Sequence, residues 1–331
     1  MFGQNSVAME NINATRRTVL KLMGGAALLG AIPFTGMSSV PDERFPKATS
    51  NPKPKASDFV FCLNMSTIRG QNLGFVGELE TAAKAGFPAV EIWIRTLQDY
   101  LEKGGTLKEA KTNIDDLGLT VEDSIGFAPW IVDDDAVRTR GLEQVKKEMD
   151  MLAAIGCKRI AAPPAGATRE PGLDLNKAAG RYRAILELGD QSGVIPHLEI
   201  WGHSQNLNRL SQVLYVATET GHPSARILLD VYHLYKGGSS IDTLHLAGKA
   251  GVEMLHINDY PDIPRETITD GDRVYPGEGV GPVQQIVRSL RSPDRPLVIS
   301  LEVFNKKYWE QDALEVCRTG LEKMKAAVAG V

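Results

Sequence analysis

Cysteine is scarce in this chain of 331 residues, which contains three, and no two of them are spaced as C-x-x-C. An odd number of cysteines without that spacing argues against a disulfide framework and against a cysteine-rich metal site. We therefore expect Cys62, Cys157 and Cys317 to be buried apolar residues.

Positive charge is not concentrated anywhere in the sequence. The chain has 37 basic and 41 acidic residues, a formal net charge of −4, and no segment that interleaves Lys or Arg with aromatic residues. Nucleic acids and anionic membranes are bound through basic surfaces that neutralise phosphate groups. We therefore expect neither of them as a partner.

Long hydrophobic runs are absent as well. The apolar, small-residue segment at positions 22–32 follows the basic pair Arg16 and Arg17. It is shorter than the roughly 18 to 20 residues that a membrane span requires, so we expect no stable membrane anchor. A charged region ahead of a short apolar one resembles a twin-arginine export signal.

This signal predicts how the chain is divided. Residues 1–39 are expected to be the export signal, read by the twin-arginine export machinery, which would deliver the protein to the periplasm or the extracellular space. Residues 40–57, rich in Pro, Ser and Lys, are expected to form a flexible linker. Residues 58–331 then form one domain.

Within that domain, short β-branched or apolar runs alternate with helical segments, which is typical of repeated βα units and a parallel sheet. The predicted strands are Phe59–Asn64, Ala89–Ile94, Thr120–Ile125, Arg159–Ala162, Ile195–Ile200, Ile227–Val231, Met254–Asn258 and Val298–Val303. The predicted helices are Phe75–Ala85, Thr106–Leu117, Ala136–Ile155, Leu175–Gln191, Leu207–Thr220, Ile241–Ala250, Pro282–Leu290 and Asp312–Val328.

Eight βα units in about 270 residues predict an α/β fold, the (β/α)8 TIM barrel, whose usual size is about 250 residues. A doubly wound open sheet is the rival architecture. It is disfavoured because no G-x-G-x-x-G turn follows the first strand and no P-loop occurs. Glycines at the predicted helix ends are expected to be left-handed C-caps, namely Gly86, Gly118, Gly156, Gly193, Gly221 and Gly251.

Polar residues end four successive apolar runs in the second half of the domain. They are Glu199, Asp230, His256 and Glu302, on the predicted fifth to eighth strands. The carboxyl ends of barrel strands meet at one face, where TIM-barrel active sites lie. Three carboxylates and one imidazole suit one divalent ion, Mn²⁺, Mg²⁺, Co²⁺ or Zn²⁺.

These residues carry a resemblance to a known family. The signatures L-E, L-D-x-x-H, L-H-x-N-D and S-L-E, in this order, resemble those of the xylose isomerase-like sugar isomerases and epimerases. The resemblance implies that Glu199, Asp230, His256 and Glu302 bind one divalent metal, and that Glu199 and Glu302 also transfer protons. It further implies that His233 and Arg273, the latter shortly before the P-G-x-G turn at Pro276, contact the substrate.

One departure concerns substrate identity. Ketose 3-epimerases carry a second glutamate six positions after the ligand on the fifth strand, and this chain has Gln205 there. His203, between them, is a further candidate for substrate contact. His197, two residues before Glu199, is predicted either to orient that glutamate or to be a satisfied core histidine. Glu91 on the second strand is an equally open candidate for the cavity.

The expected function is isomerisation or epimerisation of a sugar or polyol ketone, a small carbohydrate substrate. Removing a proton next to a carbonyl creates an enediolate that a cation stabilises, and two carboxylates supply acid and base. A lyase or dehydratase acting on an inosose or keto-sugar is the close alternative. A non-catalytic carbohydrate-binding barrel and an endonuclease-like barrel are the more distant ones. The oligomeric state is not predicted.

The export signal can be tested directly. Replacing Arg16 and Arg17 together with Lys should leave the protein in the cytoplasm, because the arginine pair is the feature that the export machinery reads. Fractionation of cells expressing both forms, followed by immunoblotting, measures this. Equal periplasmic or extracellular yield of the two forms would disprove the signal.

Overall fold

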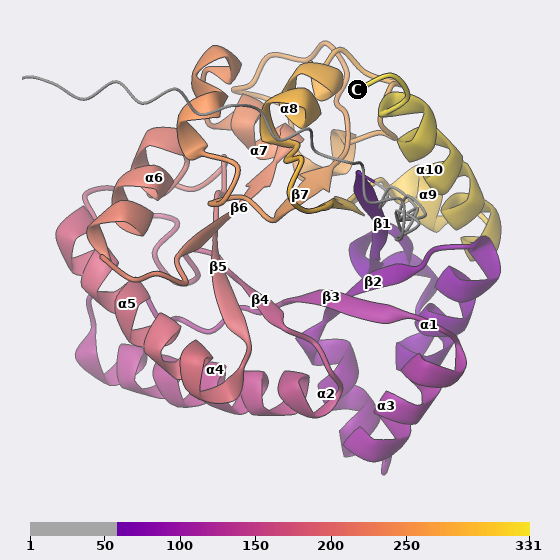
Figure 1. The fold of residues 1–331 in the computed structure, drawn as a ribbon, viewed down its shortest axis with the longest axis horizontal. Helices are drawn as coiled ribbons and strands as arrows, with labels where there is room; N and C mark the ends of the chain where they lie inside the picture. The colour runs from indigo at the N-terminus through magenta and orange to yellow at the C-terminus, as the bar shows by residue number, and fades with distance from the viewer. Residues whose placement is uncertain (1–57) are drawn as a thin grey trace, which may run out of the picture. The chain divides into compact units, whose positions relative to one another are not determined.

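Eight parallel strands form one sheet in the order β3-β2-β1-β8-β7-β6-β5-β4. The computed structural model describes residues 58–331, and the predicted signal and linker lie outside the described residues. The strands are β1 (Phe59–Asn64), β2 (Ala89–Trp93), β3 (Thr120–Ile125), β4 (Arg159–Ala162), β5 (Ile195–Glu199), β6 (Arg226–Asp230), β7 (Met254–Ile257) and β8 (Leu297–Leu301). Because β3 and β4 at the two ends of this order lie side by side, the sheet curls into a barrel (Figure 1). The predicted TIM barrel is confirmed.

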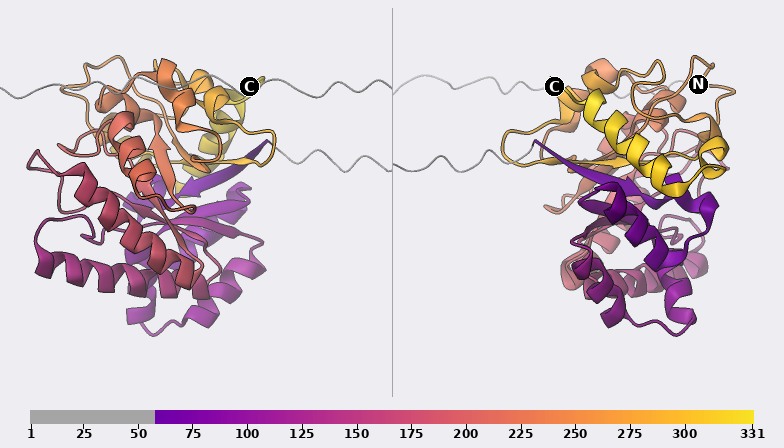
Figure 2. Two further views of the ribbon diagram at one scale, coloured as in Figure 1. Left: turned by 60° about the vertical axis from the view of Figure 1, so that its left-hand side comes forward. Right: turned by 90° about the vertical axis from the view of Figure 1, so that its right-hand side faces the viewer.

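Helices cover the outside of the ring (Figure 1). They are α1 (Gly74–Ala85), α2 (Ile94–Glu102), α3 (Leu107–Asp116), α4 (Asp135–Ala154), α5 (Leu175–Ser192), α6 (Leu210–Glu219), α7 (Val231–Lys236), α8 (Val283–Leu290), α9 (Lys306–Trp309) and α10 (Ala313–Ala327). Three short 3-10 helices are η1 (Met65–Gln71), η2 (Ile241–Ala247) and η3 (Asp270–Asp272). Figure 2 shows α10, in yellow, beside α1, so the last helix packs against the first.

The structure differs from the prediction in the short elements. The helices α2, α7 and α9 were not predicted, since α2 and α7 begin directly where a strand ends and α9 has only four residues. The helix predicted over Ile241–Ala250 is the shorter 3-10 helix η2. Gly251 does not have a positive φ, and the C-cap of η2 is Gly248, whose φ of 68° and ψ of 145° lie outside the left-handed helical region.

The remaining glycine predictions are confirmed. Five of the six predicted C-cap glycines have φ between 57° and 93°, which residues with a Cβ atom rarely adopt. These are Gly86, Gly118, Gly156, Gly193 and Gly221. All three cysteines are buried and unpaired, as expected. No helix among residues 58–331 is long and apolar enough to span a membrane.

The barrel interior changes from apolar to polar along the strands. A small apolar cluster fills one layer and includes Cys62, Ala89, Leu228, Met254 and Val298. Two residues further along each of these strands, where the side chain points to the same face, the residue is polar. These polar residues are Asn64, Glu91, Asp230, His256 and Ser300, and all are fully buried. The carboxyl end of the barrel therefore holds a buried polar layer above an apolar floor.

Candidate functional site

Four predicted metal ligands meet at the carboxyl end of the barrel. Glu199 and Asp230 are the last residues of β5 and β6, His256 lies near the end of β7, and Glu302 directly follows β8. Strand register brings them together, since Asp230 and His256 face each other across the β6–β7 ladder. All four side chains are at least 95% buried.

One nitrogen atom is the centre of this group. The Nδ1 atom of His256 lies 3.1 Å from Glu302 Oε2, 3.8 Å from Glu199 Oε1 and 3.8 Å from Asp230 Oδ2. One potential ligand atom from each of Asp230, His256 and Glu302 lies within 4.8 Å of the other two. His256 Nδ1 and Glu199 Oε2 are buried without a hydrogen-bond partner. An imidazole nitrogen and a carboxylate oxygen without partners, close to two further carboxylates, could ligate a divalent cation.

The other ring nitrogen of His256 is held by Glu91. The Nε2 atom lies 2.9 Å from Glu91 Oε1, and the Ser300 hydroxyl donates to Glu91 Oε2 over 2.6 Å. Glu91 is fully buried. A carboxylate on the far nitrogen fixes the ring orientation and the tautomer of a metal-binding histidine and makes it a better ligand. Glu91 is therefore a charge within the barrel layer that contacts a predicted ligand, and it is not among the residues that line the cavity.

Arg273 supplies positive charge to the same group. Its Nη1 atom donates to Glu302 Oε2 at 2.7 Å and to Asp230 Oδ2 at 3.1 Å. Its Nη2 atom contacts Asp270 and lies 3.2 Å from His233 Nε2. The guanidinium also lies over the ring of Tyr232, 4.4 Å from its centroid. Arg273 was predicted to contact the substrate, and the structure places it against two of the predicted ligands.

The two predicted catalytic glutamates have opposite electrostatic environments. Burial raises the pKa of Glu199 well above its usual value, and the nearby Glu302 carboxylate adds to this. Burial acts the same way on Glu302, but His256 and Arg273 outweigh it and hold its pKa well below the usual range. Such a pair of carboxyl groups can hold a proton on one member and accept one on the other. A bound cation would lower the pKa of Glu199 as well.

Buried amides complete the ligand layer. Asn258 donates to Asp230 Oδ2 over 3.0 Å, and Asn64 donates to Glu302 Oε1 over 3.3 Å. Burial raises the pKa of Asp230 to about 6 although Arg273 opposes this effect. Both amides follow the last apolar residue of their strand, as Glu199, Asp230 and Glu302 do, and this position was the signal that could have identified them.

A cavity of about 220 Å³ opens above the ligands. Its charged and polar lining consists of Glu199, His203, His233, Asp270, Arg273 and Glu302. Its apolar lining consists of Trp93, Ile125, Phe127, Trp201 and Phe304. A larger hollow of about 490 Å³ lies beside residues that precede β6 and β7, at the opposite end of the barrel and away from this set. The smaller cavity is therefore the candidate active site.

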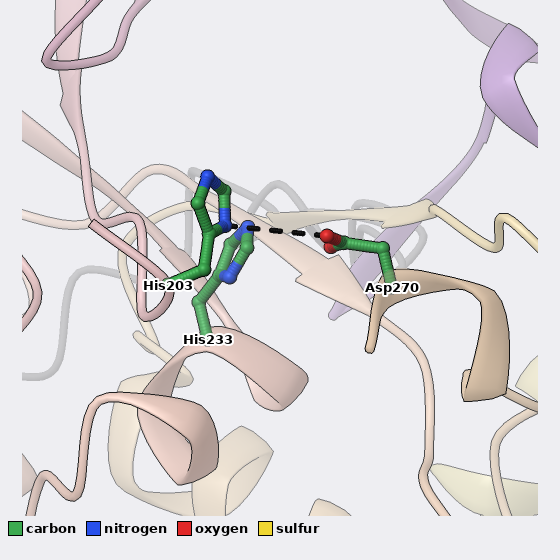
Figure 3. Close-up of side chains that lie close together, drawn as sticks. All are labelled: His203, His233 and Asp270. Atoms are coloured by element: carbon green, nitrogen blue, oxygen red, sulfur yellow. Dashed lines mark ion pairs between the residues drawn. The ribbon is translucent and has the colours of Figure 1, made fainter. Parts of the chain in front are cut away.

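The two histidines predicted to contact the substrate lie together at the cavity, with Asp270 facing them (Figure 3). His203 Nδ1 is 4.0 Å from Asp270 Oδ2, and the His203 and His233 ring centroids are 5.4 Å apart. Burial and Arg273 hold the pKa of His233 well below its usual value, so its ring is neutral. The Nδ1 atom of this ring is buried and has no hydrogen-bond partner. Asp270 was not predicted, because it lies in a long loop without strand-end spacing.

His197 lies apart from this site. It is the buried middle residue of β5 and lines a separate pocket of about 250 Å³ with Arg159, Arg226 and Glu253. Burial, with Arg159 and Arg226 nearby, lowers the pKa of His197 to about 3. Within residues 58–331, no hydrogen bond joins His197 to Glu199. The structure therefore does not bring this predicted pair together.

Comparison with known proteins defines the class. The chain belongs to the xylose isomerase-like TIM barrel family, whose model matches residues 79–327. The match covers most of the described barrel and agrees with the resemblance seen in the strand-end signatures.

Individual relatives are similar in sequence or in fold. An inosose isomerase of Halalkalibacterium halodurans is 28% identical over 274 residues, covering 78% of this chain and 92% of that protein. A 3-dehydro-D-guloside 4-epimerase of Escherichia coli is 25% identical over 222 residues, covering 62% of this chain and 78% of that protein. The solved structure of the IolI protein with a binding zinc atom has a TM-score of 0.73 at 22% identity. The match covers 81% of this chain and 98% of that protein. This last likeness concerns the fold.

The contact between Glu91 and His256 generates a prediction. Glu91→Gln should weaken Mn²⁺ binding roughly 10- to 100-fold, because the neutral amide orients and polarises the imidazole less well than the carboxylate. Calorimetric titration of chelator-treated protein measures the affinity. Glu80→Gln, which removes one exposed carboxylate on α1, is the control and should bind as the wild type does. Unchanged affinity in Glu91→Gln would contradict the positioning role.

Proposed function

We propose that this protein is a divalent-metal-dependent isomerase or epimerase of a sugar or polyol ketone that works through an enediolate. The observation that carries the proposal is the group of three carboxylates within 3.1–3.8 Å of His256 Nδ1 in a buried cavity. The similarity to proteins named inosose isomerase and 3-dehydro-D-guloside 4-epimerase supports a carbohydrate substrate.

Glu199, Asp230, His256 and Glu302 would hold one ion, Mn²⁺, Mg²⁺, Co²⁺ or Zn²⁺. When bound, the ion stabilises negative charge on the oxygens of the substrate during proton removal. The zinc atom in the structure of the IolI protein, a fold relative, is consistent with a site of this kind. The mixed carboxylate and imidazole set does not by itself select one of these metals.

Glu199 and Glu302 would move the protons. They lie on strands that are three positions apart around the barrel, so they approach a bound ring from different directions. One carboxylate takes the proton from the carbon next to the carbonyl, and the electron pair of that bond forms the enediolate. If the other carboxyl group is protonated and returns its proton to the same carbon from the opposite side, the product is the epimer. If a proton is delivered to the former carbonyl carbon, and the hydroxyl proton of the first carbon moves to the oxygen of the second, the product is the isomer.

Arg273, His233 and His203 would bind the substrate oxygens. The Arg273 guanidinium is a fixed donor held by Tyr232 and Asp270, and it offers its charge where the enediolate oxygens develop theirs. His233 lines the cavity, and the Nδ1 atom of its neutral ring, buried without a partner in the protein, would bond a substrate hydroxyl group. Export through the twin-arginine machinery, proposed on Arg16 and Arg17, would place this chemistry outside the cytoplasm.

A lyase or dehydratase is the second candidate, and one observation favours it. His203 is a titratable group at the cavity in addition to the two glutamates, with 39% of its side chain exposed. Epimerisation needs two proton-transfer groups, whereas expulsion of a β-hydroxyl also benefits from a donor to the departing oxygen. Loss of the α-proton is common to both reactions.

The roles of the glutamates can be separated from metal binding. Glu199→Gln and Glu302→Gln retain a ligating oxygen and lose the basic carboxylate, so each should keep part of its metal while turnover falls roughly 10²–10⁴-fold. The measurements are metal content and deuterium incorporation from D₂O, followed by NMR with inososes, ketoses and 3-keto-glycosides.

The matched control is Glu310→Gln, which changes an exposed carboxylate beyond α9 and should react as the wild type does. In an epimerase, one of the two catalytic-site variants should still exchange the α-proton without completing turnover. Full activity in both variants, with metal retained, would show that the proposed site is wrong.

A further inference from the structure

Three aromatic side chains line the outer part of the cavity and contact one another in sequence. Trp93 ends β2, Phe127 follows β3 and Trp201 follows β5. The ring centroids of Trp93 and Phe127 are 5.3 Å apart, and those of Phe127 and Trp201 are 6.1 Å apart. We call these three residues the aromatic rim. They come from three separate strand ends and share one cavity with Glu199 and Glu302.

Part of this aromatic surface is open to solvent. Phe127 is 39% exposed, which is unusual for a phenylalanine, and Trp93 and Trp201 are half-buried. The position of Trp93 is fixed by Arg69, whose guanidinium lies 4.3 Å from its ring centroid. An apolar surface that stays exposed next to a polar cavity is typical of a surface that a ligand covers.

Polar groups stand beside the aromatic rim. The ring of His203 lies 5.1 Å from that of Trp201, and Asp270 faces His203. About 40% of each of these two polar side chains is exposed. A surface that combines aromatic faces with hydrogen-bonding groups at one edge matches a sugar ring, which has C–H faces and a hydroxyl edge.

The size of the cavity indicates where such a ring would lie. At about 220 Å³ the cavity is smaller than the roughly 300–1,000 Å³ typical of small-molecule sites. Its charged end has room for the reacting part of a substrate next to Glu199 and Glu302. Anything attached to that part must extend outward, over the aromatic rim.

From this arrangement we propose that the substrate is a glycoside, in which a keto-sugar reaches the carboxylates and a second sugar ring stacks on the aromatic rim. The inference rests on the proposed function, because the reacting keto-sugar is what positions the second ring. It goes beyond that function by naming the substrate class. Phe127 and Trp201 are then specificity-determining residues, with His203 and Asp270 bonding the hydroxyl groups of the outer sugar.

The test compares three substrates that share one reacting sugar: a 3-keto-disaccharide, the methyl 3-keto-glycoside and the phenyl 3-keto-glycoside. The wild-type metal-loaded protein should have the lowest KM for the disaccharide. In Phe127→Ala and Trp201→Ala the KM for the disaccharide should rise on the order of tenfold, with kcat changed much less, because a stacking contact is lost. The KM for the methyl glycoside should rise clearly less.

Tyr215→Ala is the matched control. Tyr215 is also an exposed aromatic residue, at 40%, but it lies on α6 outside the cavity lining, so its loss should leave all three KM values unchanged. Thermal melting of each variant confirms that it is folded, and Phe127→Tyr, which keeps a ring, should restore the KM for the disaccharide.

Several results would overturn the inference. Equal KM changes for the methyl glycoside and the disaccharide would show that the aromatic rim does not bind a second ring. A lower KM for the phenyl glycoside than for the disaccharide would indicate that the aromatic rim binds an apolar aglycone, and would contradict the proposal that it binds a second sugar ring.

Absence of α-proton exchange with every keto-substrate would count against the proposed function and not by itself against the rim. The rim is then tested by titrating tryptophan fluorescence with unoxidised cellobiose and with methyl glucoside. Tighter binding of cellobiose that is lost in Phe127→Ala supports the rim. Equal binding of the two sugars disproves it.

Discussion

Three carboxylates buried within a few ångströms of one another repel each other strongly, and the rest of the site compensates for that repulsion. Glu199, Asp230 and Glu302 are at least 95% buried, where charges are poorly solvated. Arg273 supplies positive charge, and the neighbouring Glu302 and Glu91 carboxylates raise the pKa of His256 well above its usual value although burial opposes this, so a proton on its ring takes the place of a cation. Such a cluster is costly to keep unless a cation binds it, so its presence is a strong physical indication of a metal site.

The surrounding barrel makes this cluster possible. The lower interior layer is apolar and holds the strands in register, and the layer above it is polar. Within the polar layer Glu91 and Ser300 anchor His256, while Asn64 and Asn258 anchor two of the carboxylates. Above the ligands the lining turns aromatic. The predicted ligands thus lie in one layer of the barrel, with the apolar layer beneath them and the aromatic lining of the cavity above them.

Much of this could be predicted from sequence, and the exceptions have physical causes. Strand positions were predictable because the strands are short apolar runs, and six of the eight follow a glycine near the end of the preceding helix. The ligands were predictable because a carboxylate or an imidazole stands at or next to the end of each of the last four runs. Glu91 was ambiguous, since a charge inside a strand can either reach the cavity or lie within a barrel layer, and its partner His256 is 165 residues away. The roles of Arg273 and Asp270 depend on how a long loop folds over the barrel, and no local periodicity encodes that. His197 has the right strand face for the site, but two residues along a strand are enough to place it in another layer.

The central claim is that one divalent ion binds among Glu199, Asp230, His256 and Glu302. The most direct measurement is a crystal structure of Mn²⁺-loaded protein with anomalous scattering data at the manganese edge. The account predicts one strong peak bounded by these four side chains, with His256 bound through Nδ1 and still held by Glu91 through Nε2. A peak among His203, His233 and Asp270, or none at the strand ends of a protein saturated with Mn²⁺, would contradict it.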